Sequence, residues 1–291
     1  MITEGHLTRH FQGQRGGRSP ALIDIAQDHA LMILSAEGIF DLGVVLKGGT
    51  ALRKYRAGNA GRFSTDLDFG GADDGNAELI LATLDGASLD GFSFRVESVH
   101  EYRRSRLHID SPFGSPEIPA RIDCSPRSPW LRPEVLPPVP MAIHRTYETQ
   151  IPEIPVIRKE ELLSEKLARY RRASLARDLY DLAWFARGGA FNETLVRRLT
   201  VLKVWQDVIS DGLGGGPFHP DDILGTRDAD DFAEEDIGNL TTPLDFSNWI
   251  EAVQDRYAFL ADLDEDEIAI ARCSPGDAHE VRTMIDAIGG A

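Results

Sequence analysis

The stretch Val45–Phe69 reads VLKGGTALRKYRAGNAGRFSTDLDF and decides which fold we expect. It begins with an apolar run that predicts a buried strand, and Gly48-Gly49 end that strand with a tight turn. Thr50 is a suitable N-cap for a short helix through Ala57, after which Ser64–Phe69 predicts a second strand. The order strand, turn, helix and strand predicts a small sheet with helices packed against it.

The segments on either side extend this pattern into two domains. Helices are predicted at 21–38 and 77–84, and strands at 92–99, 104–109 and 120–124. Eight prolines fall within residues 126–155, and proline lacks the amide donor that helices and central strands need, so we expect a linker there. Further helices are predicted beyond it, at 159–172, 176–187, 193–210, 244–260 and 278–288. We therefore predict an α+β chain: a small mixed sheet with flanking helices in residues 1–150, then a mostly helical domain in 151–291.

Composition and charge narrow the classes of protein that the chain can be. It has 291 residues and a net charge of −16, and residues 211–291 hold 20 acidic and 4 basic residues. The last segment is therefore a poor nucleic-acid surface, whereas residues 1–210 are neutral overall and do not exclude a polyanionic partner. We find no membrane-spanning run and no secretion signal, and two cysteines cannot form a disulfide framework, so a cytoplasmic protein is expected.

Two acidic residues on the second predicted strand indicate chemistry. Asp66 and Asp68 are two positions apart, so their side chains project from the same face, with Cα atoms ~7 Å apart. Two carboxylates this close repel each other unless a cation lies between them. Mg²⁺ and Mn²⁺ prefer oxygen ligands and support phosphoryl displacement. An Asp-x-Asp pair is common on exposed strands, so this motif alone is a weak signal.

The glycine turn supplies the complementary feature. Gly48 and Gly49 let a phosphate approach the backbone amides closely, and Lys54 adds positive charge about one helical turn later. A lone Gly-Gly is usually only a turn. A strand, a diglycine and a helix followed at short distance by an acidic strand is a far more specific combination.

These residues resemble a known family. A GG[ST] turn, a short helix and a strand bearing Asp-x-Asp are the signature of the DNA polymerase-β-like nucleotidyltransferase superfamily. The longer wording KGGTAL…RFSTDLDF resembles the AbiEii/MenT-type nucleotidyltransferase toxins of bacterial toxin–antitoxin and phage-abortive-infection pairs. A second match supports this, because Glu165–Leu167 followed by Arg177–Leu182 is similar to the family's "EKL … RDLYDL" helical motif.

The resemblance implies roles for particular residues. Gly48, Gly49 and Thr50 would hold the nucleotide triphosphate, and Asp66 and Asp68 would bind Mg²⁺ or Mn²⁺.

Further roles follow from the same resemblance. Lys166 and Lys54 would neutralise phosphates, and Asp178 would be the further acid of the helical motif. Members of the superfamily usually supply a third carboxylate from a later strand, and Asp123 is the best-placed candidate for that metal ligand.

The helical motif is also notable for its charge. Residues 166–177 hold five basic residues and no acid, which suits a triphosphate or an RNA end. The alternative is a solvated helix face, in which Arg177 and Asp181 form a simple i,i+4 pair.

Together these patterns predict a metal-dependent nucleotidyltransferase toxin. The resemblance implies transfer of a nucleotide from a nucleoside triphosphate to RNA, with the tRNA 3′ end as acceptor, blocked translation and a cognate antitoxin as partner. Two alternatives stay open: a protein hydroxyl as the acceptor, in an AMPylation-like modification, or a nucleotide-binding partner without turnover.

Overall fold

A computed structural model gives the fold and describes residues 2–12, 17–100, 103–237 and 243–289. The chain divides into two compact units. Unit 1 contains Met1–Pro129 and Pro133–Ile157, and unit 2 contains Trp130–Arg132, Arg158–Ile237 and Leu244–Ala291. None of the described helices is both long and apolar enough to cross a lipid bilayer.

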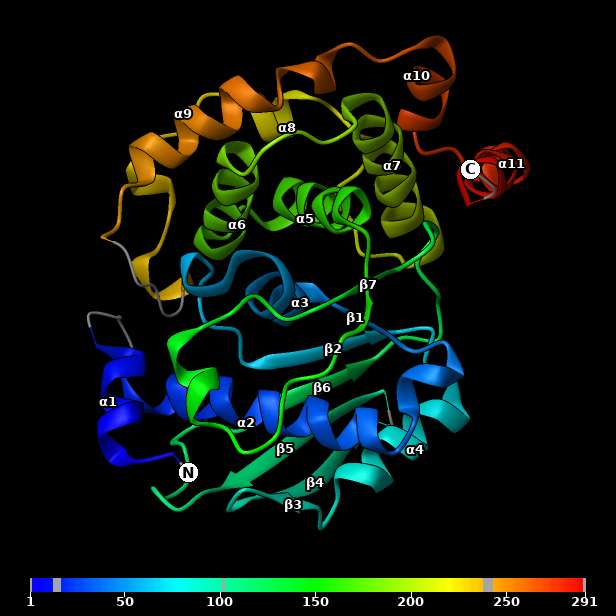
Figure 1. The fold of residues 1–291 in the computed structure, drawn as a ribbon. Helices are drawn as coiled ribbons and strands as arrows, with labels where there is room; N and C mark the ends of the chain where they lie inside the picture. Colours follow the sequence, from blue (N-terminus) through cyan, green and yellow to red (C-terminus); the bar gives the residue numbers. More distant parts are fainter. Residues whose placement is uncertain (1, 13–16, 101–102, 238–242, 290–291) are drawn as a thin grey trace. The chain divides into compact units, whose positions relative to one another are not determined.

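Unit 1 is built on one mixed sheet of eight strands in the order β3-β4-β5-β6-β2-β1-β8-β7 (Figure 1). The strands are β1 Val45–Lys47, β2 Asp66–Gly70, β3 Ser88–Leu89, β4 Phe92–His100, β5 Arg104–Asp110, β6 Ala120–Cys124, β7 Glu134–Leu136 and β8 Ile154–Val156. β2 lies inside the sheet, antiparallel to β1 and parallel to β6. This position fixes the direction of every side chain on β2.

Four helices accompany the sheet, namely α1 Glu4–Phe11, α2 Arg18–Ala36, α3 Gly48–Leu52 and α4 Asp74–Leu84. Figure 1 shows α2 running across the sheet. Its residues from Pro20 to Met32 are all buried, as expected for a helix enclosed by other elements. Leu67 and Phe69 of β2 and Ile122 of β6 are fully buried on one face and contribute to the core. The opposite face of these strands carries the polar residues.

The predicted elements of unit 1 are found, with two differences. The helix expected to run through Ala57 is α3 followed by a π-helical turn at Arg53–Ala57. The proline-rich segment contains the three-residue strands β7 and β8, with Leu46 opposite Val156. Such short strands need few amide donors and therefore tolerate the prolines around them. The predicted boundary at 150/151 precedes β8, whereas unit 1 continues to Ile157.

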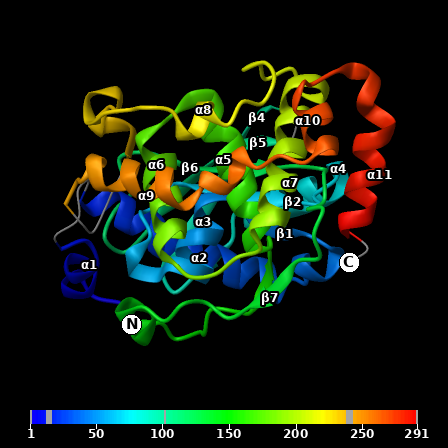
Figure 2. The same cartoon turned by 90° about the horizontal axis from the view of Figure 1, so that it is seen from above.

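Unit 2 is helical, as the sequence predicts. Its helices are α5 Lys159–Ala173, α6 Ala176–Arg187, α7 Glu193–Trp205, α8 Asp221–Leu224, α9 Phe246–Arg256, α10 Glu265–Ala271 and α11 Ala278–Gly289. α5 packs against α6 and α7, and α6 packs against α9, which lies beside it in Figure 2. The mixed sheet and the helical unit together confirm the predicted α+β class.

One short segment, Trp130–Arg132, belongs to unit 2 although the residues before and after it in the sequence belong to unit 1. The buried carboxylate of Glu161 on α5 accepts hydrogen bonds from the amides of Trp130 and Leu131, each at 2.8 Å. Lys203 of α7 donates to the same carboxylate at 2.7 Å, and its ammonium lies 3.8 Å from the centre of the Trp130 indole ring. These contacts fix Trp130–Arg132 to the helical unit.

Candidate active site

The two aspartates of β2 lie on the open face of the sheet. Residues alternate along the strand, so Leu67 and Phe69 are fully buried while Asp66 and Asp68 are partly exposed. The Asp66 side chain is 31% exposed and accepts a hydrogen bond from the Thr65 hydroxyl at 3.2 Å. The strand therefore presents both carboxylates on one side, as the spacing predicts.

The diglycine turn is in direct contact with the second aspartate. Lys47, the last residue of β1, is the register partner of Asp68, which brings Gly48 next to that side chain. Gly48 has a φ of +73°, and a Cβ at this position would be 1.8 Å from Oδ2 of Asp68. Glycine is required here for two reasons: the left-handed backbone and the absence of space for a side chain. The turn and the carboxylate thus form one compact site.

The next two residues hold the turn in place. A Cβ on Gly49 would lie 2.8 Å from the hydroxyl of Ser64 and 3.1 Å from a guanidinium nitrogen of Arg62. Thr50 is fully buried, and its hydroxyl donates a hydrogen bond to the backbone carbonyl of Asp66. That hydroxyl joins the helix to β2. The backbone of the turn is therefore the part of GGT that can contact a phosphate, and the role of Gly48, Gly49 and Thr50 in holding the triphosphate stays a prediction.

Asp123 lies beside the pair on the neighbouring strand. β6 runs parallel to β2, and Asp123 is the direct register partner of Asp68. Its carboxylate is 35% exposed and accepts a hydrogen bond from Nε of Arg104 at 3.0 Å. Burial, together with Asp123 and Asp68, raises the pKa of the adjacent Cys124 thiol to about 12. Three carboxylates therefore share one region of the open face, and arginines of β5 and β6 lie beside Asp123 and Asp66.

The donors on this face suit a hard divalent cation. Mg²⁺ is commonly bound by one or two carboxylates together with substrate phosphates and water. Asp66 and Asp68 provide such a pair beside a backbone that admits a phosphate. In the described ranges no three His, Cys, Asp or Glu side chains form a ready-made metal cage. The arrangement fits a cation whose remaining ligands are the phosphates of a bound nucleotide and water.

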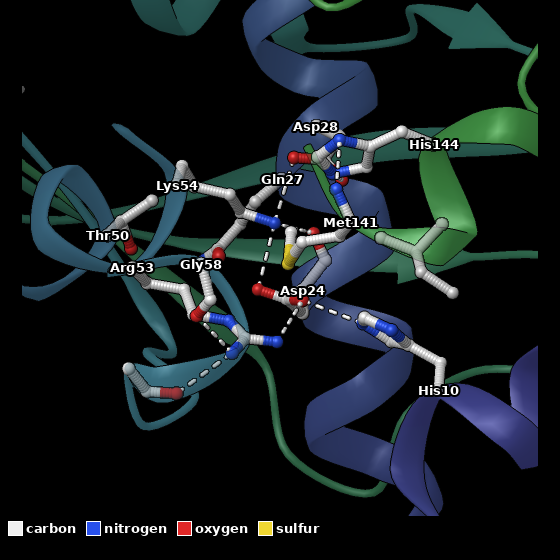
Figure 3. Close-up of polar contacts among 12 residues, drawn as sticks. His10, Asp24, Gln27, Asp28, Thr50, Arg53, Lys54, Gly58, Met141 and His144 are labelled. Carbon is white, nitrogen blue, oxygen red and sulfur yellow. Dashed lines mark hydrogen bonds and ion pairs between the residues drawn. The ribbon is translucent and has the colours of Figure 1, made fainter. Parts of the chain in front are cut away.

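Lys54 lies away from this face, in a buried ionic cluster (Figure 3). Its side chain has no exposed surface, and its ammonium is 2.8 Å from a carboxylate oxygen of Asp24 and 2.8 Å from one of Asp28. Arg53 and His10 bind the same Asp24 carboxylate, at 3.3 and 2.8 Å. The predicted role of Lys54 in neutralising triphosphate charge needs an exposed ammonium, and here two carboxylates already neutralise it. This placement differs from the sequence-based expectation.

The cluster joins several elements of unit 1. Tyr147 donates a hydrogen bond to Asp28 at 2.7 Å, and His144 lies 3.6 Å from the same carboxylate. Burial alone would raise the pKa of Asp24, but Lys54 and Arg53 hold it well below its usual value. Burial keeps the pKa of the His144 imidazole below its usual value, so this ring stays neutral near pH 7. The cluster therefore fixes the helix that follows the diglycine turn.

The cluster was absent from the sequence-based expectations, although a signal for it exists. Asp24 and Asp28 are four positions apart within the apolar run LIDIAQDHALM. Carboxylates in such a run must find cationic or hydrogen-bonding partners when the helix is buried. The spacing indicates that partners are needed, but not which residues supply them.

The two motif residues of the helical unit are also buried and paired. Lys166 on α5 forms an ion pair with Asp181 on α6 at 2.6 Å. Asp178 on α6 is 1% exposed, and Nε of Arg169 lies 3.1 Å from its carboxylate. The "EKL … RDLYDL" motif thus joins α5 to α6 through two charge pairs. Lys166 thus pairs with Asp181, the residue that the alternative interpretation of the sequence pairs with Arg177.

Two arginines of the basic run at residues 166–177 form hydrogen bonds inside unit 2. Arg171 is buried and donates hydrogen bonds to the carbonyls of Gly215 and Gly216, at 2.7 and 3.0 Å. Arg172 donates to Asp207 at 2.5 Å. Arg171 and Arg172 therefore have partners within unit 2, whereas the basic run suggested an exposed face that binds phosphate.

Comparisons with known proteins agree with this geometry. The model of the AbiEii nucleotidyl transferase toxin family, of a type IV toxin–antitoxin system, matches residues 33–274. The chain is similar to MenT4, a nucleotidyltransferase toxin from Mycobacterium tuberculosis H37Rv, with 42% identity and a TM-score of 0.94 over 99% of this chain and 100% of that one. A candidate nucleotidyltransferase from H. pylori, 17% identical over 81% of this chain and 94% of its own, has a TM-score of only 0.44 and carries no argument. A search of curated proteins gives no match.

Proposed function

The chain belongs to the AbiEii family of nucleotidyltransferase toxins, and on that premise we propose that it transfers a nucleotide from a nucleoside triphosphate to the 3′ end of a tRNA. Such an addition would prevent aminoacylation and stop translation. A toxin of a toxin–antitoxin system has an antitoxin counterpart, which is the expected partner of this protein.

The observation that supports the proposal best is the contact between Gly48 and Asp68. A triphosphate on the amides of Gly48 and Gly49 would lie directly beside the carboxylates of β2. A scaffold that only binds nucleotides has no need to hold two carboxylates against the phosphate site, because they would repel the ligand. The pair is useful only when a cation accompanies the nucleotide.

Each group of residues in the site has a different role in the proposed reaction. Asp66 and Asp68 would hold Mg²⁺ or Mn²⁺, which when bound lowers the pKa of an attacking hydroxyl and offsets charge on the leaving pyrophosphate. The diglycine backbone would orient the triphosphate, and the buried hydroxyl of Thr50 keeps that turn fixed to β2. Asp123, paired with Arg104, would orient the acceptor side of the site.

The roles that the motif predicts for Lys166 and Asp178 stay predictions, since Asp181 and Arg169 already pair with these two side chains. Lys166→Arg retains the positive charge and the pair with Asp181, whereas Lys166→Met removes both. If Lys166 neutralises phosphate, the arginine variant keeps most of the transfer activity and the methionine variant loses it. A thermal melt of each variant separates this result from loss of folding.

Transfer of label to RNA tests the proposed function. Purified protein is incubated with each labelled nucleoside triphosphate and total tRNA, in Mg²⁺ and in Mn²⁺, with Asp66→Asn/Asp68→Asn as the control. We expect label at RNA 3′ ends for the unaltered protein and none for the variant. No labelled RNA under any of these conditions would refute the proposal, and label on protein instead would favour an AMPylation-like activity.

A further inference from the structure

We propose that two arginines next to the acidic pair, Arg121 and Arg106, bind backbone phosphates of the acceptor RNA. We call them the arginine row. The proposal rests on the proposed function, and it assigns a binding surface for the strand that receives the nucleotide.

The register of the sheet places this row beside Asp66. Asp66 on β2 is the partner of Arg121 on β6, and Arg121 is the partner of Arg106 on β5. Glu97 on β4 ends the same line of residues. Adjacent strands are ~4.8 Å apart, so the row begins next to the acidic pair and extends ~10 Å across the open face.

The arginine row places two like charges opposite each other, each with an acidic neighbour on its other side, Asp66 for Arg121 and Glu97 for Arg106. Two like charges directly opposite each other on neighbouring strands repel and lower stability. The two side chains are 64% and 55% exposed, so no burial of their stems compensates fully for this repulsion. Two exposed guanidinium groups opposite each other therefore form a positive patch that a phosphate can reach from solvent.

The guanidinium groups also retain their donors. Arg121 is 3.9 Å from Asp66, and Arg106 is 3.7 Å from Glu97, both too far for hydrogen bonds. Each arginine forms one ion pair with a single acidic neighbour, which engages only part of the five N–H donors of an exposed guanidinium. Glu97 accepts a hydrogen bond from His108 at 3.0 Å. Each arginine thus offers the planar set of N–H donors that suits a phosphate.

The position of the row indicates which phosphates it binds. The order β5-β6-β2-β1 places the diglycine turn, which follows β1, on one side of the acidic pair and the arginine row on the other. The nucleotide triphosphate is proposed for the turn. The row therefore faces the opposite reactant, and an RNA strand approaching the acids from β5 would carry its phosphates over the two arginines.

Salt-dependent RNA binding tests the row without any turnover. Binding of a fluorescently labelled tRNA transcript is followed by anisotropy between 50 and 200 mM NaCl, with no nucleotide added. Arg106→Ala/Arg121→Ala is compared with Arg272→Ala/Arg282→Ala, which removes the same charge from two exposed arginines of unit 2. Loss of two phosphate contacts should lower the salt slope by about 1.4–1.8, so that Kd changes about 7- to 12-fold less over this range than for the unaltered protein.

Two further measurements exclude other roles. In the transfer assay we expect the first variant to raise KM for tRNA and to leave KM for the nucleotide unchanged. Thermal melting should show little change, because the variant removes one like-charge pair and two exposed ion pairs together. A salt slope equal to that of the control variant, or a rise in KM for the nucleotide alone, would each overturn the proposal. An unaltered protein that binds tRNA but transfers no label would refute the proposed function. The anisotropy comparison would still show whether the arginine row binds RNA phosphates.

Discussion

Replacement of Gly48 by alanine should separate the fold from the active site. Alanine in a left-handed conformation costs about 1–2 kcal/mol of unfolding free energy. Its Cβ would also start 1.8 Å from Asp68, whereas real Cβ contacts are not shorter than 3.0 Å, so the carboxylate must move by at least 1.2 Å. Rotating it off its preferred rotamer adds about 0.5–1.5 kcal/mol. A displacement of this size at a reacting group lowers the rate about 100-fold.

Gly86→Ala is the matched control for this change. Gly86 has a φ of +79°, but a Cβ there would meet no atom within 4 Å. Both variants therefore carry the backbone strain, and only Gly48→Ala displaces Asp68. Urea denaturation measures the stability of each, and transfer of labelled nucleotide measures the rate. Equal transfer rates for the two variants would refute the reasoning that joins the diglycine turn to the carboxylate.

Three further predictions concern charge. Lys54→Met removes the ammonium shared by two buried carboxylates, Asp24 and Asp28, and should lower the free energy of unfolding by about 3–5 kcal/mol in urea denaturation; unchanged stability with lost transfer would instead restore a phosphate-binding role. Asp66→Asn and Asp68→Asn should each reduce transfer at least about 100-fold, and Asp123→Asn less, because Asp123 already has an arginine partner. The lowered pKa of His144 means that the unfolded chain binds more protons below pH ~6.5, so stability should fall as the pH drops from there; a denaturation series from pH 7.5 to 5 that His144→Gln leaves unchanged would contradict this.

Local sequence patterns were enough to predict most elements of the sheet. The strand at 120–124 has the predicted bounds, because strict alternation of apolar and polar residues is a purely local signal. The short helix after the diglycine was expected to continue regularly, and the structure instead has a π-helical turn at Arg53–Ala57. There Arg53 reaches the carbonyls of Gly58 and Gly61, contacts that a helical periodicity does not reveal.

The candidate site was predictable where its residues are neighbours in sequence. Asp66 and Asp68 share a face because they are two positions apart on one strand. Contacts between distant segments were not predictable: the ion pairs of Lys54 depend on how α2 packs, and the pairing of Arg106 with Arg121 depends on the register of β5 with β6. Propensity and spacing carry no information about such partners.

The excursion of Trp130–Arg132 into the helical unit means that no single cut of the polypeptide yields two complete halves. A fragment beginning at Arg158 would lack the two backbone amides that donate hydrogen bonds to Glu161. The buried carboxylate would then keep the hydrogen bond from Lys203 but lose the other two. A truncated helical unit should therefore be less stable than the same unit within the full chain, unless Trp130–Arg132 is supplied with it.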